Sequence, residues 1–287
     1  MQKKHLSALK KFYWVLAFVL ILLITTVVWL YSGTLSEAKL KIFKTVPLPM
    51  ALVNGRPISA GKFLARFAVA QKTLGQNGAE GTKLAIASEL IREAEVSRLA
   101  SQRDVAVSAK QIDLEYAAVS GQTDLGGGPN FEEFLQSRGL SESSFKNDVL
   151  KPKLLLNGLR IWFNLQPNLN SAAYQKANSL LEQINSGGNM PALAARFSED
   201  AAGKSADGDM GFVQITDLSP ELRESVSNMK PGEVKIIPGL LGINIIRLEG
   251  QTGNLLHLRQ IFLNTNDFNA WLDSQAKNFK IINLLKI

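Results

Sequence analysis

The chain has 287 residues, a formal net charge of +7 and no cysteine. This length allows one or two modest domains, and the lack of cysteine excludes disulfides and thiolate metal sites. Seven lysines and a single acidic residue precede residue 45, so most of the net charge is N-terminal and no basic face remains for nucleic acid.

An uncharged run of 20 residues, 12–31, follows the first four lysines. At 1.5 Å per residue, a helix of this length crosses a hydrocarbon core of about 30 Å. Aromatic residues near both ends and the lysines before the run predict a single-pass cell-membrane anchor, with a cytoplasmic N-terminus and extracytoplasmic main domains. A cleaved signal peptide is the alternative, but no clear Ala-x-Ala site follows. We expect a tail and transmembrane helix over 1–32 and a stalk over 33–47.

A mainly helical region follows the expected stalk. Residues 51–59 read as two short extended pieces joined by an Asn-Gly turn. Apolar residues at helical spacing and polar N-caps then predict helices, the last of them interrupted near Pro152. Their expected ranges are 62–71, 81–103, 108–120, 131–138 and 141–162.

Three segments of this region, Leu52–Ser59, Leu90–Ala94 and Phe134–Ser141, resemble the helical N-terminal domain of the SurA and PrsA foldases. The resemblance covers residues 48–163 and implies a chaperone domain of an exported bacterial protein. It also implies that a parvulin domain follows.

The region from Ala177 to Leu248 alternates short helices, tight turns and apolar strands. A helical pattern over 177–184 ends at a Gly-Gly pair, which is typical of a helix C-terminus. Ser219 is the expected N-cap of a later helix, with Pro220 at its first position. The other expected elements are a helix at 191–197, a loop at 208–212, a turn at 230–233 and strands at 234–237 and 242–248.

Five motifs in this region resemble, in their order and spacing, the PpiC-like parvulin family of peptidyl-prolyl isomerases. They are Ser198–Asp200, Asp207–Gly211, Leu218–Leu222, Lys230–Val234 and Gly242–Ile246. The resemblance implies a small antiparallel sheet covered by helices. Together with the preceding region, it gives an α+β chain.

The first strand of the parvulin pattern is missing before Ala177 and is found instead at Leu258–Leu263. We therefore expect a circularly permuted domain over 171–263, whose first strand is 258–263. The termini of compact domains often lie close together, which makes such an exchange physically reasonable. Residues 264–287 are expected to form a C-terminal amphipathic helical segment that packs on the protein, since its polar face is poor in lysine and arginine.

The parvulin resemblance implies a polar floor and an apolar pocket for a proline ring. By position, the floor consists of Asp200, Asn244 and Gln260. The pocket consists of Met210, Leu218 and Leu222. Rotation about an X-Pro bond needs no nucleophile, metal or cofactor, because favouring the twisted amide over the planar one is sufficient. We therefore expect no metal and no small-molecule cofactor.

Two functions remain open, because amides replace both histidines of the family pattern and Leu222 replaces an aromatic residue. One is a weak prolyl isomerase and foldase that acts on unfolded or proline-containing exported polypeptides. The other is a catalytically silent chaperone, in which Asn244 and Gln260 are ordinary strand residues and Asp200 is a loop or cap residue. The chain has only two histidines, His5 and His257, so a histidine-rich zinc site is excluded.

Overall fold

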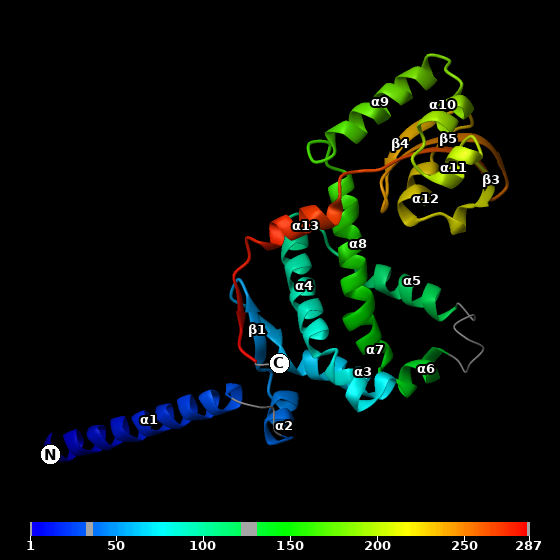
Figure 1. The fold of residues 1–287 in the computed structure, drawn as a ribbon. Helices are drawn as coiled ribbons and strands as arrows, with labels where there is room; N and C mark the ends of the chain where they lie inside the picture. Colours follow the sequence, from blue (N-terminus) through cyan, green and yellow to red (C-terminus); the bar gives the residue numbers. More distant parts are fainter. Residues whose placement is uncertain (1, 33–36, 122–130, 286–287) are drawn as a thin grey trace. The chain divides into compact units, whose positions relative to one another are not determined.

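The computed structural model describes residues 2–32, 37–121 and 131–285, without the side chains of 2–13, 15, 37, 40, 44, 76, 77 and 80. The chain divides into two compact units. The first unit comprises residues 1–95, 120–145 and 277–287, and the second comprises 96–119 and 146–276. Figure 1 shows the elements of both units.

The first unit contains helices and a three-stranded sheet, one strand of which comes from the C-terminal segment. Its elements are α1 (Gln2–Tyr31), α2 (Glu37–Thr45), β1 (Pro49–Val53), β2 (Arg56–Ser59), α3 (Ala60–Glu80), the first part of α4 (Lys83–Ser101), α6 (Phe131–Ser137), α7 (Glu142–Phe145) and β7 (Ile281–Asn283). The strand order is β2-β1-β7.

The predicted Asn-Gly turn joins β1 to β2. Asn54 and Gly55 have φ values of 48° and 78°, and two positive φ angles are what a tight antiparallel hairpin requires. Ser59 then caps α3, because its side chain accepts a hydrogen bond from the backbone N–H of Lys62. The hairpin expected at 51–59 is therefore confirmed.

The C-terminal segment, expected to be helical over 264–287, is helical among its described residues only at Phe268–Ala276. Residues 281–283 form strand β7, which pairs antiparallel with β1 and places Ile282 opposite Leu52. The backbone N–H groups of Leu284 and Leu285 both donate to the carbonyl of Met50. The free edge of β1 offers hydrogen bonds to this segment, and its β-branched residues favour a strand.

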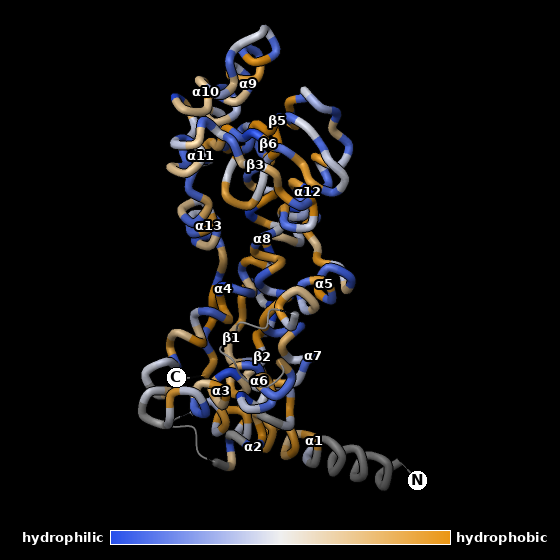
Figure 2. Tube along the Cα trace, turned by 90° about the vertical axis from the view of Figure 1, so that its right-hand side faces the viewer, coloured by the Kyte–Doolittle hydropathy of each residue, from blue (hydrophilic) through white to orange (hydrophobic). Residues whose placement is uncertain are grey.

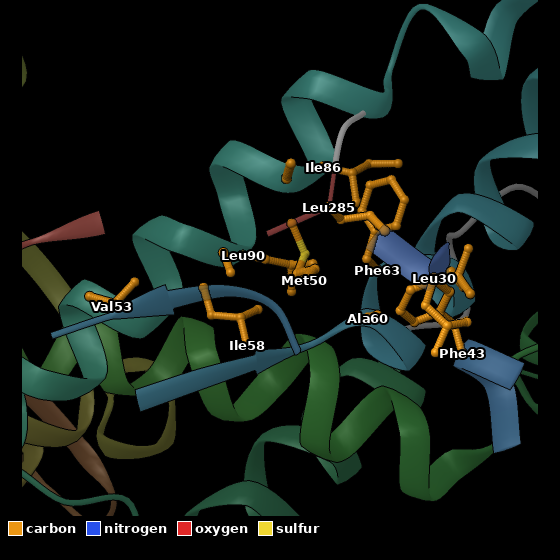
Figure 3. Close-up of a cluster of buried hydrophobic side chains, with 13 residues drawn as sticks. Leu30, Phe43, Met50, Val53, Ile58, Ala60, Phe63, Ile86, Leu90 and Leu285 are labelled. Carbon is orange, nitrogen blue, oxygen red and sulfur yellow. The ribbon is translucent and has the colours of Figure 1, made fainter. Parts of the chain in front are cut away.

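A single apolar core holds the first unit together. Phe43, Met50, Phe63, Leu90 and Leu285 are almost fully buried and come from five separate segments, as Figure 3 shows. Phe43 belongs to α2, so residues 37–45 of the expected stalk form a helix packed on this core.

Helix α1 carries the uncharged run, and its described side chains at positions 14 and 16–29 are exposed. Figure 2 colours this part of the helix as hydrophobic. Within the part of the chain that the structure describes, no helix meets the length and hydropathy that a membrane span requires. The side chains of residues 12, 13 and 15 of the expected anchor lie outside the described residues.

The second unit begins with helical elements and continues into a four-stranded sheet with its covering helices. Its elements after the end of α4 are α5 (Ala109–Ser120), the π-helical turn η1 (Lys146–Leu150), α8 (Lys151–Asn164), α9 (Ser171–Asn185), α10 (Met190–Phe197), α11 (Ala201–Ser205), β3 (Asp209–Gln214), the 3₁₀ turn η2 (Ile215–Asp217), α12 (Pro220–Val226), β4 (Val234–Pro238), β5 (Ile243–Thr252), β6 (Leu255–Leu263) and α13 (Phe268–Ala276). The helix expected over 141–162 is interrupted at η1, directly before Pro152, which lacks the N–H that continues an α-helical ladder.

The strand expected at 258–263 lies inside this sheet. The strand order is β3-β6-β5-β4 and every neighbouring pair is antiparallel, so β6 pairs on both sides. β5 and β6 form one long hairpin, in which Ile246 lies opposite Gln260 and Asn244 opposite Phe262. The predicted strand is confirmed and holds a central position.

The two faces of this sheet carry separate apolar cores, because successive strand residues point to opposite sides. On one face, Ile245 and Ile261 pack against α9 and α10 through Leu180 and Ala194. On the other face, Ile246 and Leu258 pack against Leu218, Val226 and the half-buried residues around α12. Figure 1 shows these helices around the sheet. We call the first the α9 face and the second the α12 face.

Candidate functional site

Asn244 and Gln260 lie side by side on the α12 face. Each is two residues from an apolar residue of that core on its own strand, Ile246 on β5 and Leu258 on β6. Gln260 Nε2 donates to Asn244 Oδ1 at 2.6 Å, and Asn244 Nδ2 donates to the Ile237 carbonyl at 3.1 Å. The structure therefore joins the two expected floor residues directly.

The two amides differ in what they can still offer a ligand. Asn244 is only 7% exposed, and both ends of its amide have partners. Gln260 is half-buried, and the bond to Asn244 uses one of its two Nε2 hydrogens. An amide has two donor hydrogens and an acceptor oxygen. Gln260 can therefore place a donor or an acceptor on this face while Asn244 holds its orientation.

Asp200 serves as the N-cap of α11. Its Oδ2 accepts from the backbone N–H of Gly203 at 2.6 Å, and its Oδ1 accepts from the Ser198 hydroxyl at 2.6 Å. Ser198 Oγ in turn accepts from the backbone N–H of Phe262 at 3.0 Å. A Cβ at position 203 would lie 2.5 Å from Asp200 Oδ2, so a larger residue there would push the capping carboxylate aside. The geometry connects Asp200 to β6 through Ser198, and within the described chain these bonds do not extend to Asn244 or Gln260.

The expected pocket residues lie in or against the apolar core of the α12 face, the face that carries Asn244 and Gln260. Leu218 is 6% exposed and belongs to the apolar core of the α12 face, and Met210 and Leu222 are half-buried against the same core. Met210 comes from β3, Leu218 from the turn before α12, and Leu222 from α12 itself. Three elements therefore line one apolar patch beside the Asn244–Gln260 pair.

The start of β3, which carries Met210, is fixed by a charged cluster that sequence reasoning missed. Asp209 accepts hydrogen bonds from the Gly211 backbone N–H at 2.8 Å, from His257 Nε2 at 2.9 Å and from an Arg259 nitrogen at 3.1 Å. Three partners hold the pKa of Asp209 below its usual value. The hydrogen bond from Gly211 has the largest effect, and the bond from His257 and the charge of Arg259 follow. Alternation along β6 places His257 on the opposite face from Gln260, so it takes no part in the floor.

A second missed residue is Arg223, which follows Leu222 in α12. Its guanidinium donates to three main-chain carbonyls, those of Ile215, Thr216 and Leu218. Ser219 occupies the predicted N-cap position, but its side chain makes no capping hydrogen bond. Backbone acceptors leave no side-chain pattern in a sequence. The motifs therefore could not show that Arg223 binds these carbonyls or that the side chain of Ser219 makes no cap.

Comparison with known families accounts for both parts of the chain. Residues 5–159, more than half of the chain, match the SurA-like N-terminal domain, and residues 161–250 match the rotamase family, the PPIC-type PPIASE domain. The foldase protein PrsA 1 of Lactobacillus johnsonii is 27% identical over 173 residues, which cover 53% of this chain and 55% of that protein. The chaperone SurA of Cupriavidus pinatubonensis is 30% identical over 87 residues, which cover 30% of this chain and 17% of that protein.

Among solved structures, a peptidylprolyl isomerase (PrsA) of Bacillus anthracis is 18% identical, with a TM-score of 0.22 and coverage of 67% of this chain and 86% of that chain. The chain spans about half the length of the PrsA relative and under a fifth of the SurA relative. The chain belongs to the family defined by the SurA-like N-terminal domain and joins to it a PPIC-type rotamase domain, as a homologue of PrsA and SurA.

Proposed function

We propose that this chain is a foldase that binds proline-containing segments of unfolded exported polypeptides and isomerises their X-Pro bonds slowly. One observation carries the proposal. The Asn244–Gln260 pair lies on the same sheet face as the apolar side chains of Met210, Leu218 and Leu222. A proline ring needs the apolar part, and a twisting amide needs the polar part.

The mechanism follows from the amide itself. Resonance gives the X-Pro bond a barrier of roughly 18–20 kcal/mol, and the resonance is lost in the twisted state. A donor that bonds the twisted amide more strongly than the planar one lowers this barrier. The unused Nε2 hydrogen of Gln260 is such a donor, and Asn244 Oδ1 holds the side chain in place. Asp200 supports β6 through Ser198 rather than touching the substrate.

Binding without isomerisation is the second candidate, and a specific observation favours it. Asn244 is buried with both ends of its amide bonded within the protein, and Asp200 has the two partners of an ordinary helix cap. Only Gln260 then remains to act on the amide. In that case the apolar patch binds unfolded segments, and the first unit acts as a chaperone without turnover.

An isomerisation assay on a proline-containing peptide, with the full chain in detergent, distinguishes the two functions. If the proposal holds, Gln260→Ala removes the catalysed rate, whereas the control Gln251→Ala leaves it unchanged because Gln251 lies near the end of β5, outside the floor, and its side chain donates to the Gly253 carbonyl. A wild-type rate equal to the uncatalysed rate would establish the silent chaperone instead.

We further propose that residues 12–31 anchor the chain in a cell membrane, with residues 1–11 in the cytoplasm and both units outside. The uncharged run, the lysines before it and the exposed apolar side chains of α1 support this. Protease added to spheroplasts should then digest the chain after about residue 32. Protection of both units would contradict the orientation.

The same proposal covers the domain boundaries. Residues 48–163 would form the SurA-like domain and residues 171–263 a permuted parvulin-like domain, in which β6 replaces the family's first strand. The central position of β6 in the sheet supports the permutation. The expected boundary at residue 163 follows the family resemblance rather than the compact units, of which the second begins at Val96.

A further inference from the structure

A single side chain binds most of the segment that enters α12. Arg223 Nε donates to the Ile215 carbonyl at 3.0 Å, and its Nη2 donates to the carbonyls of Thr216 and Leu218 at 2.7 and 3.0 Å. Charge-assisted hydrogen bonds are stronger than neutral ones, and the planar guanidinium fixes the directions of its donors. The turn is therefore fixed relative to the helix that follows it.

The turn also has its own 3₁₀ bonding and the packing of Ile215 on the core of the α12 face, but its two ends are weakly bonded. Ser219 makes no side-chain cap, and the described bond at the start of the turn is the long one, 3.3 Å, from the Ile215 N–H to the Asn254 carbonyl. The last carbonyl that Arg223 binds belongs to Leu218, whose side chain is buried in the core of the α12 face. Leu222 immediately precedes Arg223 on α12. Arg223 thus ties the backbone of one pocket residue to the helix that carries another.

We propose that Arg223 is a positioning residue that sets Leu218 relative to Leu222 in the proline pocket. The role rests on the proposed isomerase function. Arg223 acts through the backbone of the turn, so its loss should loosen the apolar wall and leave the Asn244–Gln260 pair in place. Apolar contacts with the proline ring are made in both the planar and the twisted state, and their loss raises KM more than it lowers kcat.

The test compares three variants of the full chain in a proline-peptide assay. Arg223→Met removes all three bonds, and Arg223→Lys keeps the charge without the fork. Arg196→Met is the matched control, because Arg196 is an exposed arginine in the last turn of α10 and its loss removes the same charge. We expect KM to rise at least about fivefold in Arg223→Met, less in Arg223→Lys and not in the control, with kcat within about twofold throughout.

Hydrogen exchange of residues 215–222 provides a readout that does not depend on activity. Exchange should be faster in Arg223→Met than in the wild type and unchanged in Arg196→Met. Faster exchange with an unchanged KM would overturn the positioning role, and so would an equal rise of KM in the control. If Arg223→Met does not fold, a wild-type KM in folded Arg223→Lys overturns the role and a raised KM supports it. An inactive wild type overturns the proposed isomerase, and this role with it, before any variant is measured.

Discussion

The two faces of the four-stranded sheet use the same strands for different purposes. On the α9 face, Ile243, Ile245, Ile261 and Leu263 are fully buried under two helices. On the α12 face, the strands carry the polar residues Asn244 and Gln260 next to their apolar residues. Met210 and Leu222 on this face are only half-buried. Both faces therefore contain a buried core, and the α12 face also carries half-buried apolar side chains together with two amides.

Removing β6 should have the largest effect, because both faces depend on it. Truncation after Gly250 exposes the edges of β3 and β5 and removes Leu258 and Ile261 from the two cores. The loss of several kcal/mol is comparable with a total stability of about 5–15 kcal/mol. Hydrogen exchange of residues 243–248 should show no protection in the truncated chain.

Truncation after Ala276 is the matched control for that experiment. It keeps β6 and α13 and removes β7, which pairs with β1 in the first unit. Protection of residues 243–248 should survive this change. If the chain truncated after Gly250 kept the same protection, β6 would be dispensable to the sheet.

Single substitutions on the two faces should separate stability from function. Ile261→Ala leaves a cavity at a fully buried site and should destabilise the chain by about 2–5 kcal/mol, as is usual for such changes. Leu222→Ala removes a half-buried side chain and should cost about 1 kcal/mol or less. In denaturant unfolding, Ile261→Ala should lower the free energy of unfolding more than Leu222→Ala does. In a peptide-binding assay, Leu222→Ala should bind more weakly although its stability is nearly native. Equal effects of both variants on stability would remove the distinction between the faces.

The sequence predicts three of the four strands of this sheet, β4, β5 and β6, because local patterns determine them, whereas β3 begins within the loop expected at 208–212. Alternation marks β5 and β6, glycine and proline mark the turns, and the Asn54–Gly55 pair gives a hairpin of the expected kind. The family motifs also place Asn244, Gln260 and the three expected pocket residues on one face of the sheet, whereas the described bonds of Asp200 do not extend to them. Asn244 and Gln260 contact each other as diagonal neighbours on the antiparallel strands β5 and β6.

The features that the sequence does not reveal depend on distant partners or on backbone groups. β7 has three residues, too few for a periodic pattern, and its partner β1 lies more than 200 residues earlier. Phe43 is buried because other segments of the first unit surround it, not because of its own helix. Arg223 binds carbonyls, which every residue possesses, so its acceptors carry no sequence signal.

Restoring histidines to the α12 face should change activity without changing the fold. Amides do not titrate, so wild-type isomerisation should be slow and nearly flat between about pH 5.5 and 8, whereas histidine changes charge in this range. Asn244→His combined with Gln260→His should raise the rate and make it pH-dependent. Either change alone need not help, because a half-formed polar network can be worse than none.

The control for the double variant is Gln251→His, which adds a histidine outside the floor, where Gln251 is exposed. Its rate and pH profile should equal those of the wild type. A bell-shaped profile with high turnover in the wild type would contradict the floor as assigned, and would mean that other residues act on the proline bond.

The smallest expected effect concerns acid stability, which should come from groups outside the floor. Burial raises the pKa of Glu199, but hydrogen bonds from Lys176 and Asn264 outweigh it and the net pKa is lowered. The pKa of Asp209 is lowered by Gly211, His257 and Arg259. A carboxylate whose pKa is lower in the folded state stabilises the fold above its unfolded pKa, about 4.3 for Glu and 3.9 for Asp, and this contribution disappears as pH falls through the folded pKa.

Glu199→Gln and Asp209→Asn should therefore each destabilise the chain at pH 7 and match the wild type near pH 2. Both groups are partly solvated and screened, so each loss should be under about 1 kcal/mol. Glu224→Gln, on the exposed side of α12, is the control and should change little at either pH. The measurement is the denaturant midpoint of each variant at the two pH values. A deficit that persisted at pH 2 would show that these side chains act by packing rather than by charge, while the Asn244–Gln260 pair would still contribute no titratable group to either stability or turnover.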